Sequence, residues 1–239
     1  MTEHIKDILA AHPPVPAATL RPNPPAPARE PWQDNQAELL DWVGFDNPKY
    51  QAVDRTHGFV EDHRAEAKLQ EFIADLLRHI AEGAWLYLLG GKGVGKTMAM
   101  ARIVLAAPLH PNPAPAGKVH PLYVSYRFAP DVGYAFADLA VSGEPSAAID
   151  VAMSQRIYMI DDIHRWMLVG GYVRDNILAG WDTYTEKRDG KYLTVVSANL
   201  TEAQMDAVPQ FKLGLDRARE RGLILEIRGE SERGQQKTD

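Results

Sequence analysis

A glycine-rich stretch in the first half of the chain has the residue types and the spacing that bind phosphate groups. It fits the pattern G-x-x-x-x-G-K-[ST] through eight consecutive residues: Gly90, Gly91, Lys92, Gly93, Val94, Gly95, Lys96 and Thr97. Glycines let backbone N–H groups curl around a phosphate, and a side chain at Gly95 would obstruct that approach. We expect Lys96 to bridge the β- and γ-phosphates of ATP and the Thr97 hydroxyl to bind Mg²⁺. Lys92 occupies a variable position, where a solvated charge is expected.

Two neighbouring carboxylates, Asp161 and Asp162, close the apolar run 157–160. A magnesium ion that already binds phosphates and Thr97 needs a further hard oxygen ligand, and we expect Asp161 to supply it, usually through water. Asp162 is then placed to orient and deprotonate an attacking water molecule. Two acids that cap a strand at the surface are the alternative when this run is considered alone. Behind the glycine-rich loop, the functional interpretation is favoured.

Asn199 follows the next apolar run, 193–197. The carboxyl ends of parallel strands meet at one edge of a sheet, so we expect the Asn199 amide to hold the attacking water or a γ-phosphate oxygen. Taken alone, an asparagine after a strand is more often a turn residue. Its place as the third element in this order favours the functional role.

Apolar periodicity predicts the elements that position these residues. Residues 64–82 carry apolar side chains at three- and four-residue steps and are followed by Gly83, which predicts a helix. The segment 97–107 predicts the next helix. Short continuous apolar runs predict buried parallel strands, at 85–89, 122–126, 157–160, 193–197 and 223–227. The alternation predicts an α/β fold, a parallel sheet with helices on both faces.

Composition limits the class of protein. The 239 residues are 45% hydrophobic and 24% charged, as in a folded globular chain. The lack of cysteine excludes disulfide scaffolds, cysteine-ligated metal sites and thiol nucleophiles. The net charge of −6 argues against a broad basic surface that coats duplex DNA. No apolar run approaches the ~20 residues that span a bilayer, and no signal peptide is recognised, so a cytoplasmic protein without membrane contact is expected.

The N-terminal segment differs from the rest of the chain. Prolines cluster between residues 13 and 31, which predicts a flexible, extended tail over 1–33 ahead of one domain over 34–239. Ile5, Ile8 and Leu9 fall near one face of a short helical pattern. That pattern is either a docking peptide or a frayed chain end.

The order of these segments resembles the DnaC/IstB-like branch of the AAA+ P-loop ATPases, whose best-known members load the replicative helicase onto DNA. The resemblance covers about residues 55–233 and rests on five segments: 90–97, 159–163, 195–200, 216–217 and 229–233. It implies that Asn199 is the first sensor of the nucleotide and Arg233 the second. It also implies that Arg217 is the finger offered to the ATP of a neighbouring subunit, although residues 216–221 alone would be a solvated, mixed-charge helical face.

Two features depart from that family. His164 stands where many members have glycine after the acidic motif, and the proline-rich tail replaces the larger N-terminal domain that binds helicase or DNA. These departures bear on the partner more than on the ATPase.

We therefore expect a slow, Mg²⁺-dependent ATPase that works as a homo-oligomer with nucleotide at its subunit interfaces and is stimulated by assembly or DNA. The resemblance implies that it acts in DNA replication as a loader of the replicative helicase, bound through the N-terminal tail. Three alternatives stay open: a transposition helper ATPase on duplex DNA, a small-molecule P-loop phosphotransferase, and an adaptor that binds ATP but scarcely hydrolyses it. The net acidity disfavours the first, and the lack of an arginine-bearing lid disfavours the second.

Cations and aromatic rings alternate just after the acidic pair, as in surfaces that stack on unpaired bases. This pattern predicts contact with DNA, in single-stranded form, through Arg165, Trp166, Tyr172 and Arg174. Packed core is the alternative for Trp166, Met167 and Leu168.

Overall fold

The computed structural model describes residues 36–45, 62–107 and 124–229. In these ranges, five strands form one sheet in the order β2-β3-β4-β1-β5, and every pair of neighbours is parallel. The strands are β1 (Trp85–Gly90), β2 (Val124–Phe128), β3 (Ile157–Asp161), β4 (Leu193–Ala198) and β5 (Leu223–Ile227). The predicted parallel α/β sheet is confirmed.

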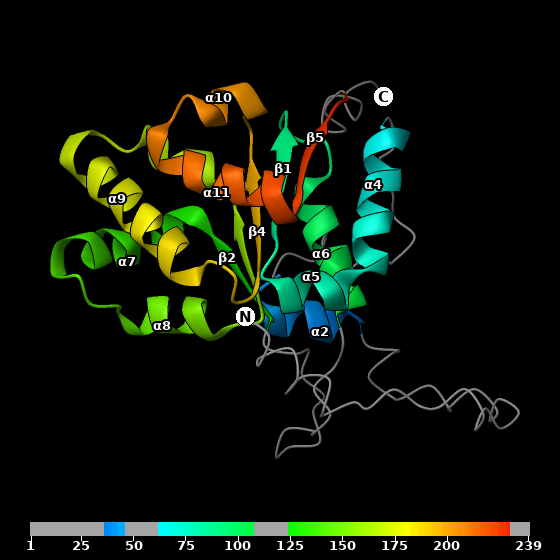
Figure 1. The fold of residues 1–239 in the computed structure, drawn as a ribbon, viewed down its shortest axis with the longest axis horizontal. Coiled ribbons are helices and arrows are strands. Elements are labelled where there is room, and N and C mark those ends of the chain that lie inside the picture. The colour runs from blue at the N-terminus through cyan, green and yellow to red at the C-terminus, as the bar shows by residue number, and fades with distance from the viewer. Residues whose placement is uncertain (1–35, 46–61, 108–123, 230–239) are drawn as a thin grey trace, which may run out of the picture. The chain divides into compact units, whose positions relative to one another are not determined.

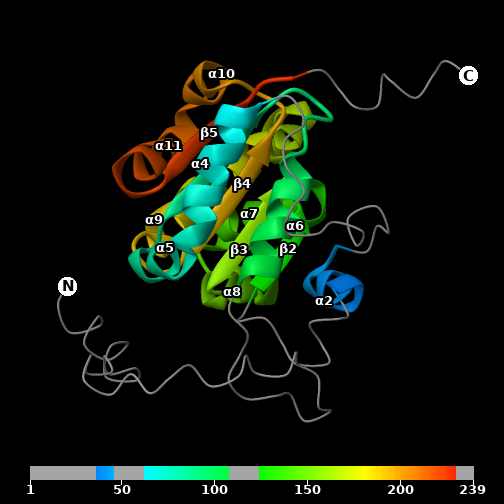
Figure 2. The same ribbon diagram turned by 90° about the vertical axis from the view of Figure 1, so that its right-hand side faces the viewer.

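Helices cover both faces of the sheet (Figures 1 and 2). One face carries α2 (Gln36–Val43), α4 (His63–Ala74), α5 (Leu76–Glu82) and α6 (Lys96–Ala106). The other face carries α7 (Ala129–Ser142), α8 (Ala147–Ser154), the 3₁₀ helix η3 (Ile163–Leu168), α9 (Gly171–Arg188), α10 (Glu202–Asp206) and α11 (Pro209–Arg221).

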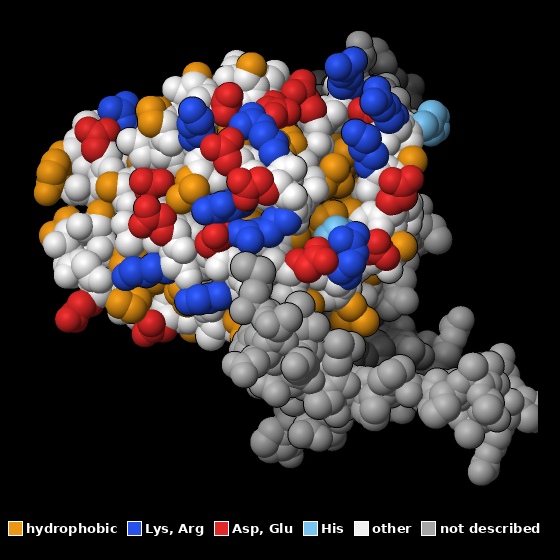
Figure 3. All heavy atoms as spheres, in the orientation of Figure 1, with side chains coloured by type: hydrophobic (Ala, Val, Ile, Leu, Met, Phe, Trp, Pro, Cys, Tyr) orange, Lys and Arg blue, Asp and Glu red, His pale blue; other side chains and the backbone are white. Residues whose placement is uncertain are grey.

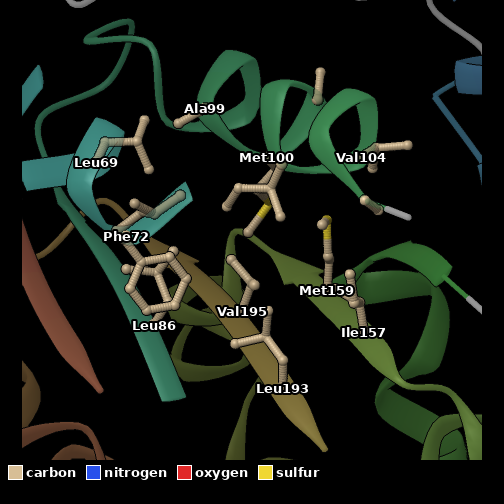
Figure 4. Packing of buried hydrophobic residues seen from close by; sticks show 14 of the residues in the cluster. Leu69, Phe72, Leu86, Ala99, Met100, Val104, Ile157, Met159, Leu193 and Val195 are labelled. Carbon is tan, nitrogen blue, oxygen red and sulfur yellow. The ribbon is translucent and has the colours of Figure 1, made fainter. Parts of the chain in front are cut away.

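Each strand supplies alternate side chains to two hydrophobic cores, because successive residues of a strand point to opposite faces. In β1, Leu86 and Leu88 belong to the core under α4 and α6, whereas Tyr87 belongs to the core under α9 and α11. Figure 4 shows the first core, where Phe72 of α4 and Met100 of α6 lie over the sheet. The α6 helix that follows the phosphate-binding loop is thereby anchored along its length.

Aromatic rings fill the second core. Trp181 of α9 lies edge-on to Trp85 of β1, with ring centroids 5.8 Å apart, and edge-on to Phe136 of α7 at 5.7 Å. Helices α7 and α9 pack closely because Gly180 has no side chain, and a Cβ at that position would overlap the Phe136 carbonyl oxygen. Trp166 of η3 joins the same core, with its ring centroid 5.1 Å from that of Phe136, so η3 is held against α7.

The helix predicted over 64–82 is divided at Asp75 into α4 and α5. Asp75 leaves helical geometry, with φ −101° and ψ 20°, and aspartate is a poor residue for a helix interior. Its side chain instead binds Arg78, at 2.9 Å. The predicted stop is confirmed, since Gly83 closes α5 in the left-handed conformation, with φ 63°.

Three predictions fall outside the described residues. They are the tail over 1–33, the apolar face formed by Ile5, Ile8 and Leu9, and the sensor role of Arg233. In the part of the chain that is described, none of the helices combines the length and the apolar character needed to cross a membrane.

Candidate nucleotide-binding site

The residues that could perform chemistry meet at the carboxyl edge of the parallel sheet, the edge toward which the β1 arrow points (Figure 1). Gly90 ends β1, Asp161 ends β3, and Asn199 directly follows β4. Strand β4 lies between β1 and β3, so these three strand ends are neighbours. The arrangement joins segments that lie far apart in the sequence.

The phosphate-binding loop, residues 90–97, is shaped by glycines in the left-handed region. Gly90 has φ 133°, Gly93 φ 87° and Gly95 φ 97°, which are conformations that side chains disfavour. At Gly90 a Cβ would also overlap the carbonyl oxygen of Ile227 in β5. Because Gly95 immediately precedes α6, the loop delivers its N–H groups to the positive end of that helix.

Lys96 points back into this loop. Its side chain is buried, and Nζ donates to the Gly90 carbonyl at 3.0 Å and to the Gly91 carbonyl at 2.6 Å. Burial lowers the pKa of Lys96 to about 8, although the carboxylates of Asp162 and Asp161 favour the charged form. The ammonium group therefore lies among loop atoms, beside the position that suits a bound phosphate.

Asp161 accepts hydrogen bonds from three hydroxyl groups. The Thr97 hydroxyl donates to Oδ2 at 2.7 Å, the Tyr126 hydroxyl donates to the same atom at 2.8 Å, and the Ser197 hydroxyl donates to Oδ1. These donors come from α6, β2 and β4, so the carboxylate is held from three directions. Asp161 itself is buried.

The oxygen donors at this edge fit a magnesium ion carried by a nucleotide. Mg²⁺ prefers hard oxygen ligands in an octahedron with bonds of ~2.1 Å, which places adjacent ligands about 3 Å apart. The Thr97 hydroxyl and the Asp161 carboxylate lie 2.7 Å apart. Among the described residues, no group of three His, Cys, Asp or Glu side chains could hold a metal, so phosphate oxygens would complete the coordination.

Asp162 turns the chain from β3 into η3. Among the described residues, Asp162 is the one non-glycine residue with a positive φ, which is 62°. Its N–H donates to the Ser197 hydroxyl at 2.9 Å. Burial raises the pKa of Asp162, and the neighbouring Asp161 carboxylate raises it further. A carboxylate of raised pKa at the edge of a phosphate site is suited to accept a proton.

The side chain of His164 lies between Asp162 and Asn199. The Asn199 N–H donates to Nδ1 of His164 at 3.2 Å, and the side-chain nitrogen Nδ2 of Asn199 lies 3.1 Å from Nε2. The same Nδ1 is 3.9 Å from Oδ1 of Asp162. The imidazole therefore lies close to both residues that the sequence assigns to the attacking water.

Arg217 does not join this group within one subunit. Its guanidinium pairs with Asp189 at 3.1 Å and with Glu220 at 3.0 Å. Asp189 follows α9 and precedes β4, so this ion pair lies toward the amino edge of the sheet, opposite the phosphate-binding loop. Figure 3 shows acidic and basic side chains interspersed over α11, as in a solvated mixed-charge face.

The predicted DNA-contact residues divide into two groups. Tyr172 is 75% exposed, and the side chains of Arg165 and Arg174 are 48% and 42% exposed. Trp166 is instead buried, and its Nε1 donates to the Ala129 carbonyl at 2.6 Å. The prediction for Trp166 is wrong, because its ring is part of the aromatic core and cannot stack on a base.

Sequence reasoning missed Ser197 and Tyr126. Ser197 is a fully buried polar residue directly after the apolar pair Val195 and Val196 of β4, which is a signal that the sequence does contain. Tyr126 contacts Asp161 because β2 is the neighbour of β3, and that neighbour relation is not visible in the sequence.

No protein-family model and no curated protein matches the sequence. Solved structures do. The DnaC helicase loader matches with a TM-score of 0.54 and 17% identity, over 76% of this chain and 100% of that one. DnaI matches with a TM-score of 0.52 and 20% identity, over 82% of this chain and 98% of that one.

The replication initiator DnaA bound to AMPPCP and single-stranded DNA matches with a TM-score of 0.53 and 17% identity, over 77% of this chain and 51% of that one. All three are AAA+ P-loop ATPases. The chain therefore has the AAA+ P-loop fold, and the resemblance seen in the sequence is confirmed at the level of the fold.

Proposed function

We propose that the chain binds ATP with Mg²⁺ and hydrolyses it. The observation that carries this proposal is the meeting of Lys96, Asp161, Asp162 and Asn199 at one edge of an AAA+ sheet. Each of these side chains has a chemical type that phosphoryl transfer requires. Lys96 comes from the phosphate-binding loop, the two aspartates from the end of β3, and Asn199 from the end of β4.

In the proposed reaction, water attacks the γ-phosphorus in line with the bond to the β,γ-bridging oxygen, which breaks and leaves ADP. Asp162 accepts a proton from the water. Lys96 leaves its loop carbonyls and donates to the β- and γ-phosphates, and Asn199 contacts a γ-phosphate oxygen or the water. Thr97 and Asp161 would hold Mg²⁺, which would supply positive charge to the phosphates.

Assembly belongs to the same proposal. Because Arg217 lies toward the amino edge, it is far from the phosphate-binding loop of its own chain, and its guanidinium would serve the ATP of a neighbouring subunit. Serving that ATP requires release from Asp189. Arg233 stays a predicted second sensor.

We further propose that the ATPase acts in DNA replication as a loader of the replicative helicase. The support is the similarity in fold to the DnaC helicase loader, which extends over the whole of that chain. Residues 1–33 would bind the helicase, and Arg165, Tyr172 and Arg174 would contact single-stranded DNA, the last two from the start of α9.

ATP turnover is tested with Lys96→Ala and with Lys68→Ala, a matched control on α4. Wild type and the control should release phosphate from ATP only with Mg²⁺, and Lys96→Ala should lose tight ATP binding while keeping its fold. Unchanged ATP affinity in Lys96→Ala would remove the phosphate-binding assignment. Tight ATP binding by wild type without any turnover would favour the adaptor function.

The loader role is tested by affinity capture from host lysate with the full chain and with residues 34–239, each in ATP and in ADP. We expect mass spectrometry to identify the ring-shaped replicative helicase with the full chain, more in ATP than in ADP, and to find it absent with the shorter chain. Equal capture by both chains would place docking on the ATPase domain, and capture of a transposase would favour the transposition helper.

A further inference from the structure

His164 occupies a position that the proposed mechanism does not use. It lies in η3, directly after the left-handed turn at Asp162, and its side chain is 15% exposed. Both ring nitrogens face Asn199, at 3.2 Å for Nδ1 and 3.1 Å for Nε2. A side chain that engages two groups of one residue can fix the orientation of that residue.

The hydrogen-bonding capacity of the ring decides this orientation. A neutral imidazole has one acceptor nitrogen and one N–H donor. Nδ1 accepts the backbone N–H of Asn199, so the proton must be on Nε2. Nε2–H needs an acceptor, and of the two amide atoms of Asn199 only the oxygen accepts. The structure has Nδ2 of Asn199 at 3.1 Å from Nε2, but two N–H donors cannot share one contact. The two ends of the amide therefore exchange places, which puts the oxygen beside Nε2–H and turns the NH₂ group away from the ring.

Burial of the side chain favours this neutral ring. Burial lowers the pKa of His164; the Asp162 carboxylate opposes that effect, and the cations Lys96 and Arg165 add to it. The Asp161 carboxylate also acts in the raising direction, more weakly. A neutral imidazole keeps the acceptor on Nδ1 that the Asn199 N–H requires.

We propose that His164 is a positioning residue that holds the Asn199 amide with its NH₂ group directed away from the ring, so that Asn199 acts as a hydrogen-bond donor to a γ-phosphate oxygen. This inference rests on the proposed ATPase function. It selects between the two roles open to Asn199, because a donor suits an anionic phosphate oxygen, whereas holding the proton side of the attacking water would need the amide oxygen.

Two substitutions test this coupling through turnover. In Gln, the amide oxygen and nitrogen can take the places of Nδ1 and Nε2–H, so His164→Gln should keep most of kcat. His164→Leu should lower kcat between about tenfold and a hundredfold, as the loss of supporting residues around a reacting group does elsewhere. It should leave the Kd for ATP nearly unchanged. His79→Leu, a matched control on α5, should keep both constants.

The decisive comparison is with Asn199→Ala. If His164 acts through Asn199, then the double variant His164→Leu/Asn199→Ala should be no slower than Asn199→Ala alone. Additive losses, or an unchanged kcat in His164→Leu, would overturn the inference.

A second readout does not depend on turnover. Long-range ¹H–¹⁵N spectra of the full chain distinguish the two tautomers of each histidine, and the His164 signals are identified by their loss in His164→Gln. We expect the Nε2–H tautomer at neutral pH. The Nδ1–H tautomer or an imidazolium would overturn the inference. If wild type failed to hydrolyse ATP, the proposed function would fall, and the tautomer would still decide the orientation of Asn199.

Discussion

Lys96 is expected to carry a positive charge although its side chain is buried. In the free protein its pKa is about 8, because burial disfavours the ammonium form more than Asp162 and Asp161 favour it. Bound phosphates would stabilise that form and raise the pKa. Below pH 8 the free protein already carries the proton, whereas above pH 8 ATP binding must take one up.

We therefore expect the association constant for ATP to be constant below about pH 8 and to fall by about tenfold per pH unit above it. Fluorescence titration with a slowly hydrolysed ATP analogue, from about pH 7 to about pH 9.5, measures this slope. Lys96→Arg is the control, because arginine keeps its charge over this range. A flat profile in wild type would show that Lys96 does not contact the phosphates.

At Asp162, one substitution can remove the proton acceptor without changing the backbone conformation. Asn tolerates the left-handed region, as Asp does, so Asp162→Asn should keep the turn at φ 62°. The amide cannot accept the proton of the water, so we expect ATP binding to persist and turnover to fall by at least about a hundredfold. Phosphate release and ATP titration on the same sample measure the two effects. Turnover near the wild-type rate would assign the proton to another group.

Individual site residues could be predicted from the sequence where they belong to a motif of fixed residue types and spacing. The phosphate-binding loop, Asp161 and Asn199 were placed at one edge by pattern and by the geometry of parallel strands, and the structure brings them there. The contact of Tyr126 with Asp161 could not be predicted, and the sequence alone could not decide between packed core and DNA contact for Trp166, because both depend on which strands and helices are neighbours.

Among the elements, α8, α9 and β4 are joined by one buried guanidinium. Arg188 ends α9, is fully buried, and donates to the Thr194 hydroxyl and to four carbonyl oxygens: Ala152, Met153, Gln155 and Leu193. The carbonyls at the end of α8 have no partner within that helix, so Arg188 supplies their donors.

Replacing Arg188 by Met should lower the free energy of unfolding by about 3 kcal/mol or more, since each buried carbonyl left unpaired costs ~1–3 kcal/mol. Urea unfolding followed by far-UV circular dichroism measures the change. Arg174→Met, on the exposed part of α9, should change it by less than about 0.5 kcal/mol. Equal effects of the two substitutions would mean that Arg188 does not support the joint.

The sequence predicted the strands within about two residues, yet it did not predict this joint. Lys187 and Arg188 end a helical pattern, and paired cations at a helix end are usually solvated. Arg188 is instead enclosed by the end of α8, by β4 and by the rings of Tyr158 and Tyr184. The sequence also did not predict the division of the 64–82 helix at Asp75, because the apolar periodicity continues across that residue.

For the whole molecule, the position of Arg217 predicts that one subunit completes the site of another. Arg217→Ala keeps its own Lys96, and Lys96→Ala keeps an intact arginine. Each variant alone should be nearly inactive, because arginine fingers contribute ~10³ to 10⁵ in rate. A mixture of the two should recover hydrolysis, measured as phosphate release.

Light scattering on the mixture supplies the control, because recovery requires that the variants assemble together. Co-assembly without any recovery would mean that Arg217 only stabilises its own chain through Asp189 and Glu220. The sequence could suggest this arginine by resemblance alone. It could not show that Asp189 holds the guanidinium, because that contact joins α11 to the turn before β4.

The strand that carries the phosphate-binding loop is paired only with later parts of the chain. In β1, Trp85 pairs with Thr194 of β4, and Leu86 pairs with Leu223 of β5. During synthesis, β1 therefore leaves the ribosome long before either partner exists, and the backbone N–H and C=O groups along its β5 edge stay unpaired until β5 is made. Contacts so distant along the chain slow folding. We expect chaperones to protect the nascent protein until β5 emerges, and we expect the loop to acquire its shape only after that.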